Sequence, residues 1–177
     1  VKGSNEDATM FSSLKEGLIK ISFFVAYIYI ISLMNDIKRV FQYHGAEHKS
    51  IFAYEKGLEL TVDNVKKMPR LHPRCGTNFI FVVLMVSTFV FSFFTFENVL
   101  TRSILKLIFF PVVAGIAYEI IKIAGKYQNP FTRVLILPGL LMQKITTREP
   151  DEKQIEVAIA ALQATLDKTE VVSPSPT

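Results

Sequence analysis

The chain has 177 residues, 50 % of them hydrophobic, and its 20 Lys and Arg against 16 Asp and Glu give a net charge of +4. This charge excess is too small to predict nucleic acid as a partner. A single cysteine cannot form an internal disulfide, so the composition also excludes a disulfide-stabilised scaffold.

The apolar residues are grouped into three long stretches, which a water-soluble domain does not easily accommodate. After a polar lead-in over residues 1–12, the stretches 17–34, 77–96 and 103–124 carry few or no charges. Each approaches the ~20 residues that an α-helix needs to cross ~30 Å of hydrocarbon. We therefore predict an all-α integral membrane protein with three transmembrane helices, forming one helical membrane domain over residues 13–168.

The first predicted loop, residues 36–76, contains an amphipathic helix. Asn35 and Asp36 can cap this helix and Gly57 can end it, so we expect it to run from about residue 37 to 56. Its apolar residues are spaced so that they fall on one stripe. The helix is therefore predicted to lie with one face against the protein or the membrane surface.

His44, Glu47 and His48 share that apolar stripe, whereas Gly45 and Lys49 lie on the opposite side. We expect the first three side chains to point inward and the opposite side to face water. Polar groups that point inward must find partners, because burying one without a hydrogen bond costs roughly 2–7 kcal/mol. The pattern therefore indicates a site.

Histidines four residues apart on a helix face the same way, so His44 and His48 can offer ring nitrogens to one metal ion. Glu47 completes a His-x-x-Glu-His run, the inverted form of the helical zinc-hydrolase motif. It can be a further ligand or the general base that activates a metal-bound water. The five-residue pattern has only three fixed positions, so by itself it is weakly specific.

The remaining histidine and the only cysteine, His72 and Cys75, are separated by two residues. A tight turn with this spacing can present both to one metal, and with His44 and His48 they form a tetrahedral set suited to zinc. Four protein ligands describe a closed structural site, so for catalysis one of them, such as Cys75, would only orient the others. The alternative is that the histidines bond to backbone or lipid headgroups and Cys75 is a small buried hydrophobe.

The rest of the chain predicts shorter elements. A capped helix is expected over residues 61–68. Residues 134–142 are apolar but too short to cross a membrane, and Pro138 with the glycine after it should break them into a surface or re-entrant segment. Residues 150–168 form an amphipathic helix, and residues 169–177 are expected to be disordered.

Three charged residues are further candidates for the site. Glu119 lies inside the third stretch, where an acid is usually functional, but an ion pair with Lys122 at headgroup level explains it equally well. Arg70 and Arg74 can hold an anionic substrate or a phospholipid headgroup. They can equally serve only to set the topology.

The distribution of basic residues predicts that topology. Eight Lys and Arg lie in the loop 36–76, against Arg102 alone between the second and third stretches. Short loops rich in Lys and Arg stay in the cytoplasm. We expect a multi-pass cell-membrane protein with its N-terminus outside, and with the metal-site loop and the C-terminus inside.

The runs at residues 41–49 and 70–77 resemble the YqhQ-like family of bacterial membrane proteins. Later runs are similar too, and the resemblance extends over about residues 12–166. It implies a bacterial inner-membrane protein and a predicted metal-dependent enzyme whose reaction is not established. Members of that family carry an additional N-terminal region, and this chain starts with Val1, so we expect it to be the C-terminal part of a longer protein.

These features together predict a metal-dependent hydrolase acting at the cytoplasmic membrane surface. A divalent ion, with zinc the best match, would be held by His44, His48, His72 and Cys75, with Glu47 as the catalytic base. The alternative is a non-enzymatic membrane transport or assembly factor with a structural metal site. Membrane lipid and a metal ion are the expected partners, and a second copy of the chain or another membrane protein is left open.

Overall fold

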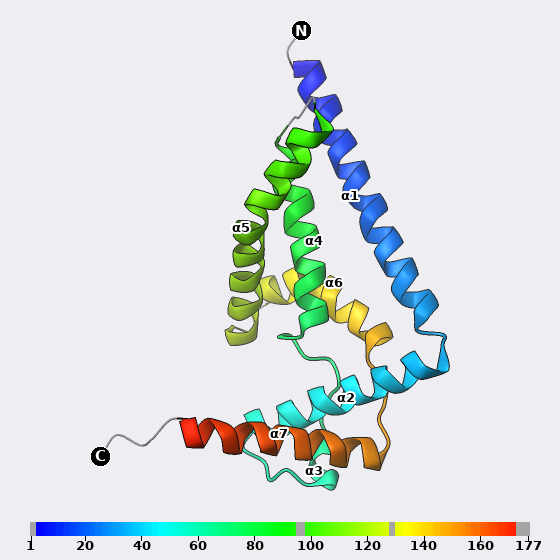
Figure 1. Cartoon of the computed structure of the whole chain (residues 1–177), viewed down its shortest axis with the longest axis vertical. Coiled ribbons are helices and arrows are strands. Elements are labelled where there is room, and N and C mark those ends of the chain that lie inside the picture. Colours follow the sequence, from blue (N-terminus) through cyan, green and yellow to red (C-terminus); the bar gives the residue numbers. More distant parts are fainter. Residues whose placement is uncertain (1–2, 95–97, 128–129, 173–177) are drawn as a thin grey trace, which may run out of the picture. The chain divides into compact units, whose positions relative to one another are not determined.

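The computed structural model of the chain describes residues 3–94, 98–127 and 130–172. Over these residues the protein is all-α, as predicted, with seven helices and no strand (Figure 1). In chain order the helices are α1 (Gly3–Ile31), α2 (Asn35–Glu55), α3 (Val62–Lys66), α4 (Gly76–Ser92), α5 (Val99–Lys126), α6 (Pro130–Thr146) and α7 (Glu152–Val172).

The single domain expected over residues 13–168 divides into two compact units. The first, here the α4–α5 unit, comprises Val1–Tyr29 and Pro73–Met142. The second, here the α2–α7 unit, comprises Ile30–His72 and Gln143–Thr177. The α2–α7 unit is thus built from two chain segments, between which the second part of the α4–α5 unit is inserted.

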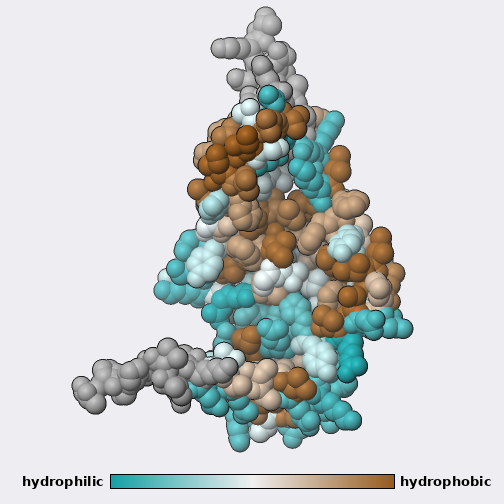
Figure 2. Space-filling view, in the orientation of Figure 1, coloured by the Kyte–Doolittle hydropathy of each residue, from teal (hydrophilic) through white to brown (hydrophobic). Residues whose placement is uncertain are grey.

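In the α4–α5 unit the two helices that name it pack along each other. Their shared core contains Val82 from α4 and Ala117 and Ile121 from α5, all buried. Small residues such as Ala117 let helices approach closely. Many large apolar side chains of the unit point outward, and hydrophobic surface gathers over α1 and α5 on the face shown in Figure 2.

Among the described residues, α5 alone is clearly long and apolar enough to cross a membrane. Its most apolar window is only 17 % buried, so most of its apolar side chains face outward. The apolar part of α1 would add a second span only if it were counted with α2, from which it is bent by 103°. The 17 residues of α4 fall short of a full crossing. Three transmembrane helices are therefore not confirmed.

In the α2–α7 unit, α2 packs against both α3 and α7. The core consists of Ala46 and Ala53 from α2, Val65 from α3, and Ile155 and Ile159 from α7. Every one of these side chains is less than a tenth exposed. The apolar face predicted for α7 is confirmed by Ile155 and Ile159. Helix α2 instead contributes Ala46 and Ala53, which lie opposite its predicted apolar stripe.

The helix ends of this unit follow local sequence signals. Gly57 has φ of 67° and ends α2 where expected. The hydroxyl of Thr61 accepts from the Asn64 backbone N–H and caps α3. Asp151 and Gln154 exchange side-chain and backbone hydrogen bonds of 2.8 and 2.9 Å, a capping box that starts α7.

Two expectations for the C-terminal part need correction. The break predicted at Pro138 is wrong, because α6 continues through it from Pro130 to Thr146. Buried Ile136 and Met142 lie on either side of the proline, and their packing offsets the lost hydrogen bond. Helix α7 reaches Val172, four residues into the tail expected to be disordered, and residues 173–177 lie outside the described part.

Candidate metal site

His44 and His48 lie one turn apart on α2 and face the same way, as their spacing predicted. Their rings meet edge to face with centroids 4.4 Å apart. A ring nitrogen of one lies within 4.8 Å of a ring nitrogen of the other. His48 is buried, whereas His44 is half-buried. Two imidazoles so close together can bind one metal ion after small side-chain adjustments.

Backbone carbonyls orient both rings. Nδ1 of His44 lies 2.8 Å from the carbonyl oxygen of Thr146, and Nδ1 of His48 lies 2.6 Å from that of Arg70. A carbonyl oxygen only accepts hydrogen bonds, so each Nδ1 must carry the proton. In the neutral ring, Nε2 then holds the lone pair. This arrangement is typical of metal-binding histidines, whose second nitrogen donates to a backbone carbonyl or carboxylate.

Gly45 explains how the chain brings the Thr146 carbonyl to His44. The backbone of residues 146–149 runs along α2, where the Arg148 N–H donates to the Phe41 carbonyl at 2.8 Å. A Cβ atom at Gly45 would lie 2.1 Å from the Arg148 carbonyl oxygen. The glycine inside the His-x-x-Glu-His run is therefore required by the close approach of this segment.

The prediction that Gly45 and Lys49 face water is wrong. Lys49 is 4 % exposed, and its ammonium group donates to the Lys66 carbonyl at 3.0 Å and pairs with Glu149. The prediction failed because it assumed one covered face. In the structure α7 and α3 cover one side of α2, and residues 146–149 cover another.

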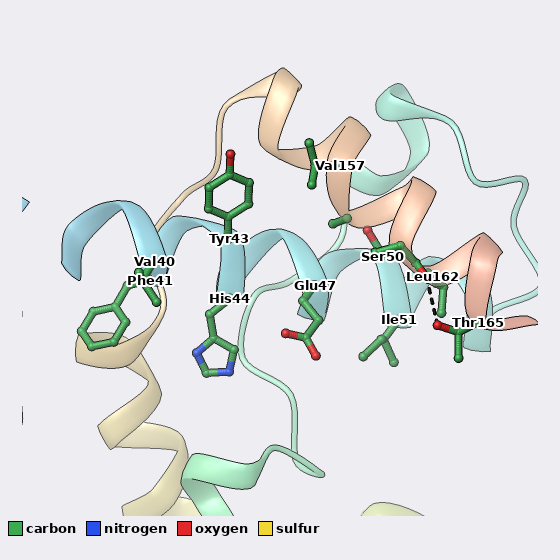
Figure 3. A pocket seen from close by; sticks show the side chains of 12 residues that line it. Val40, Phe41, Tyr43, His44, Glu47, Ser50, Ile51, Val157, Leu162 and Thr165 are labelled. Atoms are coloured by element: carbon green, nitrogen blue, oxygen red, sulfur yellow. Dashed lines mark hydrogen bonds between the residues drawn. The ribbon is translucent and has the colours of Figure 1, made fainter. Parts of the chain in front are cut away.

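Glu47 is exposed, so the prediction that it points inward is also wrong. It projects from the same side of α2 as His44 (Figure 3). Both line an open groove of about 590 Å³ between α2 and α7. The rest of the lining is mainly apolar and includes Val40, Phe41, Ile51, Val157, Ala158, Ala161 and Leu162. A carboxylate and an imidazole thus stand at the edge of a cavity large enough for a small molecule.

His72 belongs to the same unit and lies beside His48, with ring centroids 5.7 Å apart. Its backbone N–H donates to the side-chain oxygen of Gln143, and its carbonyl accepts from the nitrogen of the same amide, each at 2.8 Å. Nε2 of its ring lies 3.4 Å from a carboxylate oxygen of Glu55. A carboxylate thus orients the ring, as is common for metal-binding histidines.

Arg70 supports the site through its backbone and its side chain. The carbonyl orients His48, and the guanidinium donates to the carbonyl of Thr147. It therefore joins the two chain segments of the α2–α7 unit.

The other candidates lie in the α4–α5 unit. The Cys75 thiol accepts from the Thr77 N–H at 3.4 Å and caps α4. The side chain of Arg74 packs against Gly125 of α5. Glu119 is exposed and lies 3.3 Å from the Lys122 ammonium, which is the ion-pair alternative. The three-residue step from His72 keeps the Cys75 Cα within about 11 Å of the His72 Cα, by chain length alone.

Gln143 and Glu55 were not among the residues predicted for the site. Gln143 is fully buried, at the end of an otherwise apolar segment. A polar residue in such a place needs hydrogen-bond partners, and this requirement could have marked Gln143 as a structural residue. Glu55 follows His48 by seven residues, or two helical turns, so it lies on the same stripe of α2. Glu55 lies in the last turn of α2, and its contact with His72 joins residues 17 positions apart, so helical spacing alone could not predict it.

Comparisons with known proteins place the chain in a family. The family described as "Protein of unknown function (DUF1385)" matches residues 2–168. "Uncharacterized protein YqhQ" of Bacillus subtilis (strain 168) is 42 % identical over 152 residues, which cover 85 % of this chain and 48 % of the relative. The chain thus spans about half the length of this relative, and no solved structure matches it. Because the match extends over nearly the whole chain, the chain belongs to the DUF1385, YqhQ-like family of bacterial proteins.

Proposed function

We propose that the chain is a membrane-bound, metal-dependent hydrolase whose ion is held by His44, His48 and His72. The observation that carries this proposal is the pair of carbonyls, from Thr146 and Arg70, that fix the tautomers of His44 and His48. Two neighbouring imidazoles with oriented Nε2 lone pairs are suited to a divalent ion, and zinc is the best match for a nitrogen-rich set.

The third and fourth ligands follow from the chain around residue 72. His72 lies beside His48 and is held in place by Gln143 and Glu55. Cys75 is three residues further on, so it is proposed as a fourth ligand or as a hydrogen-bonding neighbour of the ligands. The bound ion would supply Lewis acidity, which polarises an ester or phosphoryl oxygen and makes water more acidic.

Glu47 is proposed as the general base. Its carboxylate is exposed at the groove that His44 also lines, so water and a substrate can reach it. It would take a proton from the attacking water and return it to the leaving group. The groove is lined mainly by apolar side chains beyond these two residues, which suits a substrate with an apolar part.

The membrane location is proposed from the outward-facing apolar side chains of the α4–α5 unit. Contiguous exposed apolar surface of this extent is a liability in water but is expected in lipid. We propose that α1, α4 and α5 are the three spans, with α2, α3 and α7 on the cytoplasmic side.

Single-cysteine labelling in intact cells should reach residue 5 from outside, and residues 60 and 160 only from inside. Labelling of residue 60 from outside would invert the topology.

A second candidate function is a membrane transport or assembly factor with a purely structural metal. The observation that favours it is that His44, His48 and His72 belong to an interface of α2 with two other segments, around residues 70 and 146. An ion there would also fasten these segments together. Glu47 separates the two proposals, because a structural site has no use for an exposed base.

Metal analysis of the purified protein tests the site. Wild-type protein should contain about one zinc per chain, and His44→Ala and His48→Ala should each lose most of it. Arg39→Ala, an exposed change on the same helix, is the matched control. Equal metal content in all four proteins would overturn the proposal.

Complementation of the growth defect of a deletion strain then tests catalysis. Glu47→Gln should keep the metal and the fold but lose activity by roughly 10²–10⁴, the effect expected for removing a general base. A Glu47→Gln protein that holds zinc, melts normally and complements fully would leave only the structural role.

A further inference from the structure

A second group of charged side chains lies within the α4–α5 unit and is separate from the histidines. Glu16 of α1 pairs with Lys20 at 2.7 Å and also with Arg102 of α5. Lys106, one turn further along α5, lies with its ammonium 5.6 Å from the ring centroid of Phe91 of α4. Helices α1 and α5 thus gather three cations around one carboxylate, and Phe91 of α4 lies beside them.

These side chains line a small pocket of about 50 Å³. Ser87 and Thr88 of α4 add hydroxyl groups to its wall, and Gly17 of α1 forms part of the lining. A Cβ atom at Gly17 would lie 2.0 Å from Cγ2 of Thr88, so the glycine is what allows α1 to approach α4 here. The pocket is therefore a feature of helix packing rather than a gap between loose side chains.

The pocket carries surplus positive charge. Lys20, Arg102 and Lys106 outnumber Glu16 by three charges to one, which leaves a local net charge of +2. Glu16 already accepts from two of the cations, so it cannot neutralise all three. Clustered like charges near apolar helices are costly unless a counter-charge binds between them.

We propose that this pocket binds a phosphate group. Arginine matches the oxygens of phosphate with its planar fork, lysines add point charges, and a serine hydroxyl can donate a further hydrogen bond. The side chains of Lys20, Glu16 and Arg102 are 54, 39 and 33 % exposed, so a ligand can enter from outside. The group can belong to an anionic phospholipid or to free phosphate.

The position of the cluster along the helices favours a headgroup. Glu16 and Arg102 stand immediately before the first and third apolar stretches, and Phe91 lies near the end of the second. These are corresponding ends of the three proposed spans, the depth at which lipid phosphates lie. This inference does not depend on the metal site.

Binding to the full chain, purified in detergent, tests the proposal with two probes. Native mass spectrometry measures retention of phosphatidylglycerol against phosphatidylcholine, and calorimetry measures binding of inorganic phosphate. Arg102→Gln and Lys106→Gln should each weaken binding of the preferred probe by about tenfold or more, as expected for losing a charge-assisted hydrogen bond. Lys15→Gln, next to Glu16 in sequence but outside the pocket, should change it little.

Glu16→Gln provides a change of opposite sign. It removes the carboxylate that competes for the cations, so affinity should rise, which no loss of folding can imitate. Preference for phosphatidylglycerol would identify a lipid site, and binding of inorganic phosphate alone would identify a soluble ligand. Binding of neither probe would overturn the proposal, as would Lys15→Gln weakening binding as much as Arg102→Gln. Circular dichroism and melting confirm that each variant is folded.

Discussion

The two units of the chain differ in the apolar side chains that they expose and in the polar side chains that they bury. In the α4–α5 unit, large apolar residues such as Leu107 and Val112 of α5 are 76 and 56 % exposed. In the α2–α7 unit, polar residues such as His48, Lys49 and Gln143 are less than 5 % exposed. The α4–α5 unit therefore presents a hydrophobic surface, and the interior of the α2–α7 unit contains hydrogen-bonded polar side chains.

This difference shows how a site can be held without a large apolar core. Buried polar groups are tolerated only when they have partners, and each partner fixes a position. In the α2–α7 unit these partners are mainly backbone carbonyls of Lys66, Arg70 and Thr146. Burial there defines the orientation of side chains, whereas in the α4–α5 unit it mainly serves helix contact.

Replacing Gln143 with leucine should produce the largest effect on the polar interior. The change leaves the N–H and the carbonyl of His72 buried and unsatisfied, at about 1–3 kcal/mol for each. We expect the melting temperature in detergent to fall by more than about 4 °C, with loss of bound zinc. Gln163→Leu, an exposed change on α7, is the control. Equal melting of the two variants would show that the amide does not hold His72.

The apolar surface is tested by placing a charge on it. Val112→Arg, near the middle of α5, should cost about 2.5–3.5 kcal/mol of insertion and reduce the amount of protein in the membrane fraction. Leu58→Arg adds the same charge to an exposed site in the α2–α7 unit and should be tolerated. If both variants reach the membrane equally, α5 faces water and the proposed span is wrong.

Gly45→Ala tests the close approach of residues 146–149 to α2. The added methyl group collides with the Arg148 carbonyl, so unfolding free energy should fall by about 1–3 kcal/mol despite the better helix propensity of alanine. Gly115→Ala of α5 meets no atom within 4 Å and should be neutral or slightly stabilising. Thermal melting and zinc content measure both. A stable Gly45→Ala protein with full zinc would contradict the packing described.

The smallest effect concerns the exposed ion pair between Lys66 of α3 and Glu152 of α7. The hydrogen bond from Lys66 lowers the pKa of Glu152 in the folded protein. The pair therefore stabilises the fold at pH values above the pKa that Glu152 has in the unfolded chain. This stabilisation is lost as the pH falls through the lower pKa of the folded state. Glu152 likewise raises the pKa of Lys66, so the pair weakens again in strong alkali. Melting curves of wild type and Glu152→Gln should differ slightly at neutral pH and converge in acid or high salt. A difference that persists in acid would rule out the ion pair as its cause.

The sequence predicted those features that depend on near neighbours in the chain. Gly57 ends α2 and Thr61 caps α3, because both signals act over three or four residues. The pairing of His44 and His48 follows from helical geometry alone. Such features need no knowledge of what packs against the helix.

The features it could not predict depend on segments about a hundred residues away. Lys49 is buried because Glu149, 100 residues later, lies beside it. From the local sequence, Gly45 only lowers the helix propensity of α2. The reason for a glycine at this position is the Arg148 carbonyl, which lies too close for a Cβ atom. Likewise, Pro138 remains inside α6 because tertiary packing outweighs the local preference.

Because one unit is inserted within the other, the two segments that form the α2–α7 unit are synthesised at different times. His44 and the carbonyl that orients it are 102 residues apart. At synthesis rates of about 5–20 residues per second, α2 would wait roughly 5–20 s on the ribosome for its partner segment. Throughout that interval its histidines lack the contacts that orient them. The nascent protein therefore cannot complete the proposed metal site until residue 146 has been made.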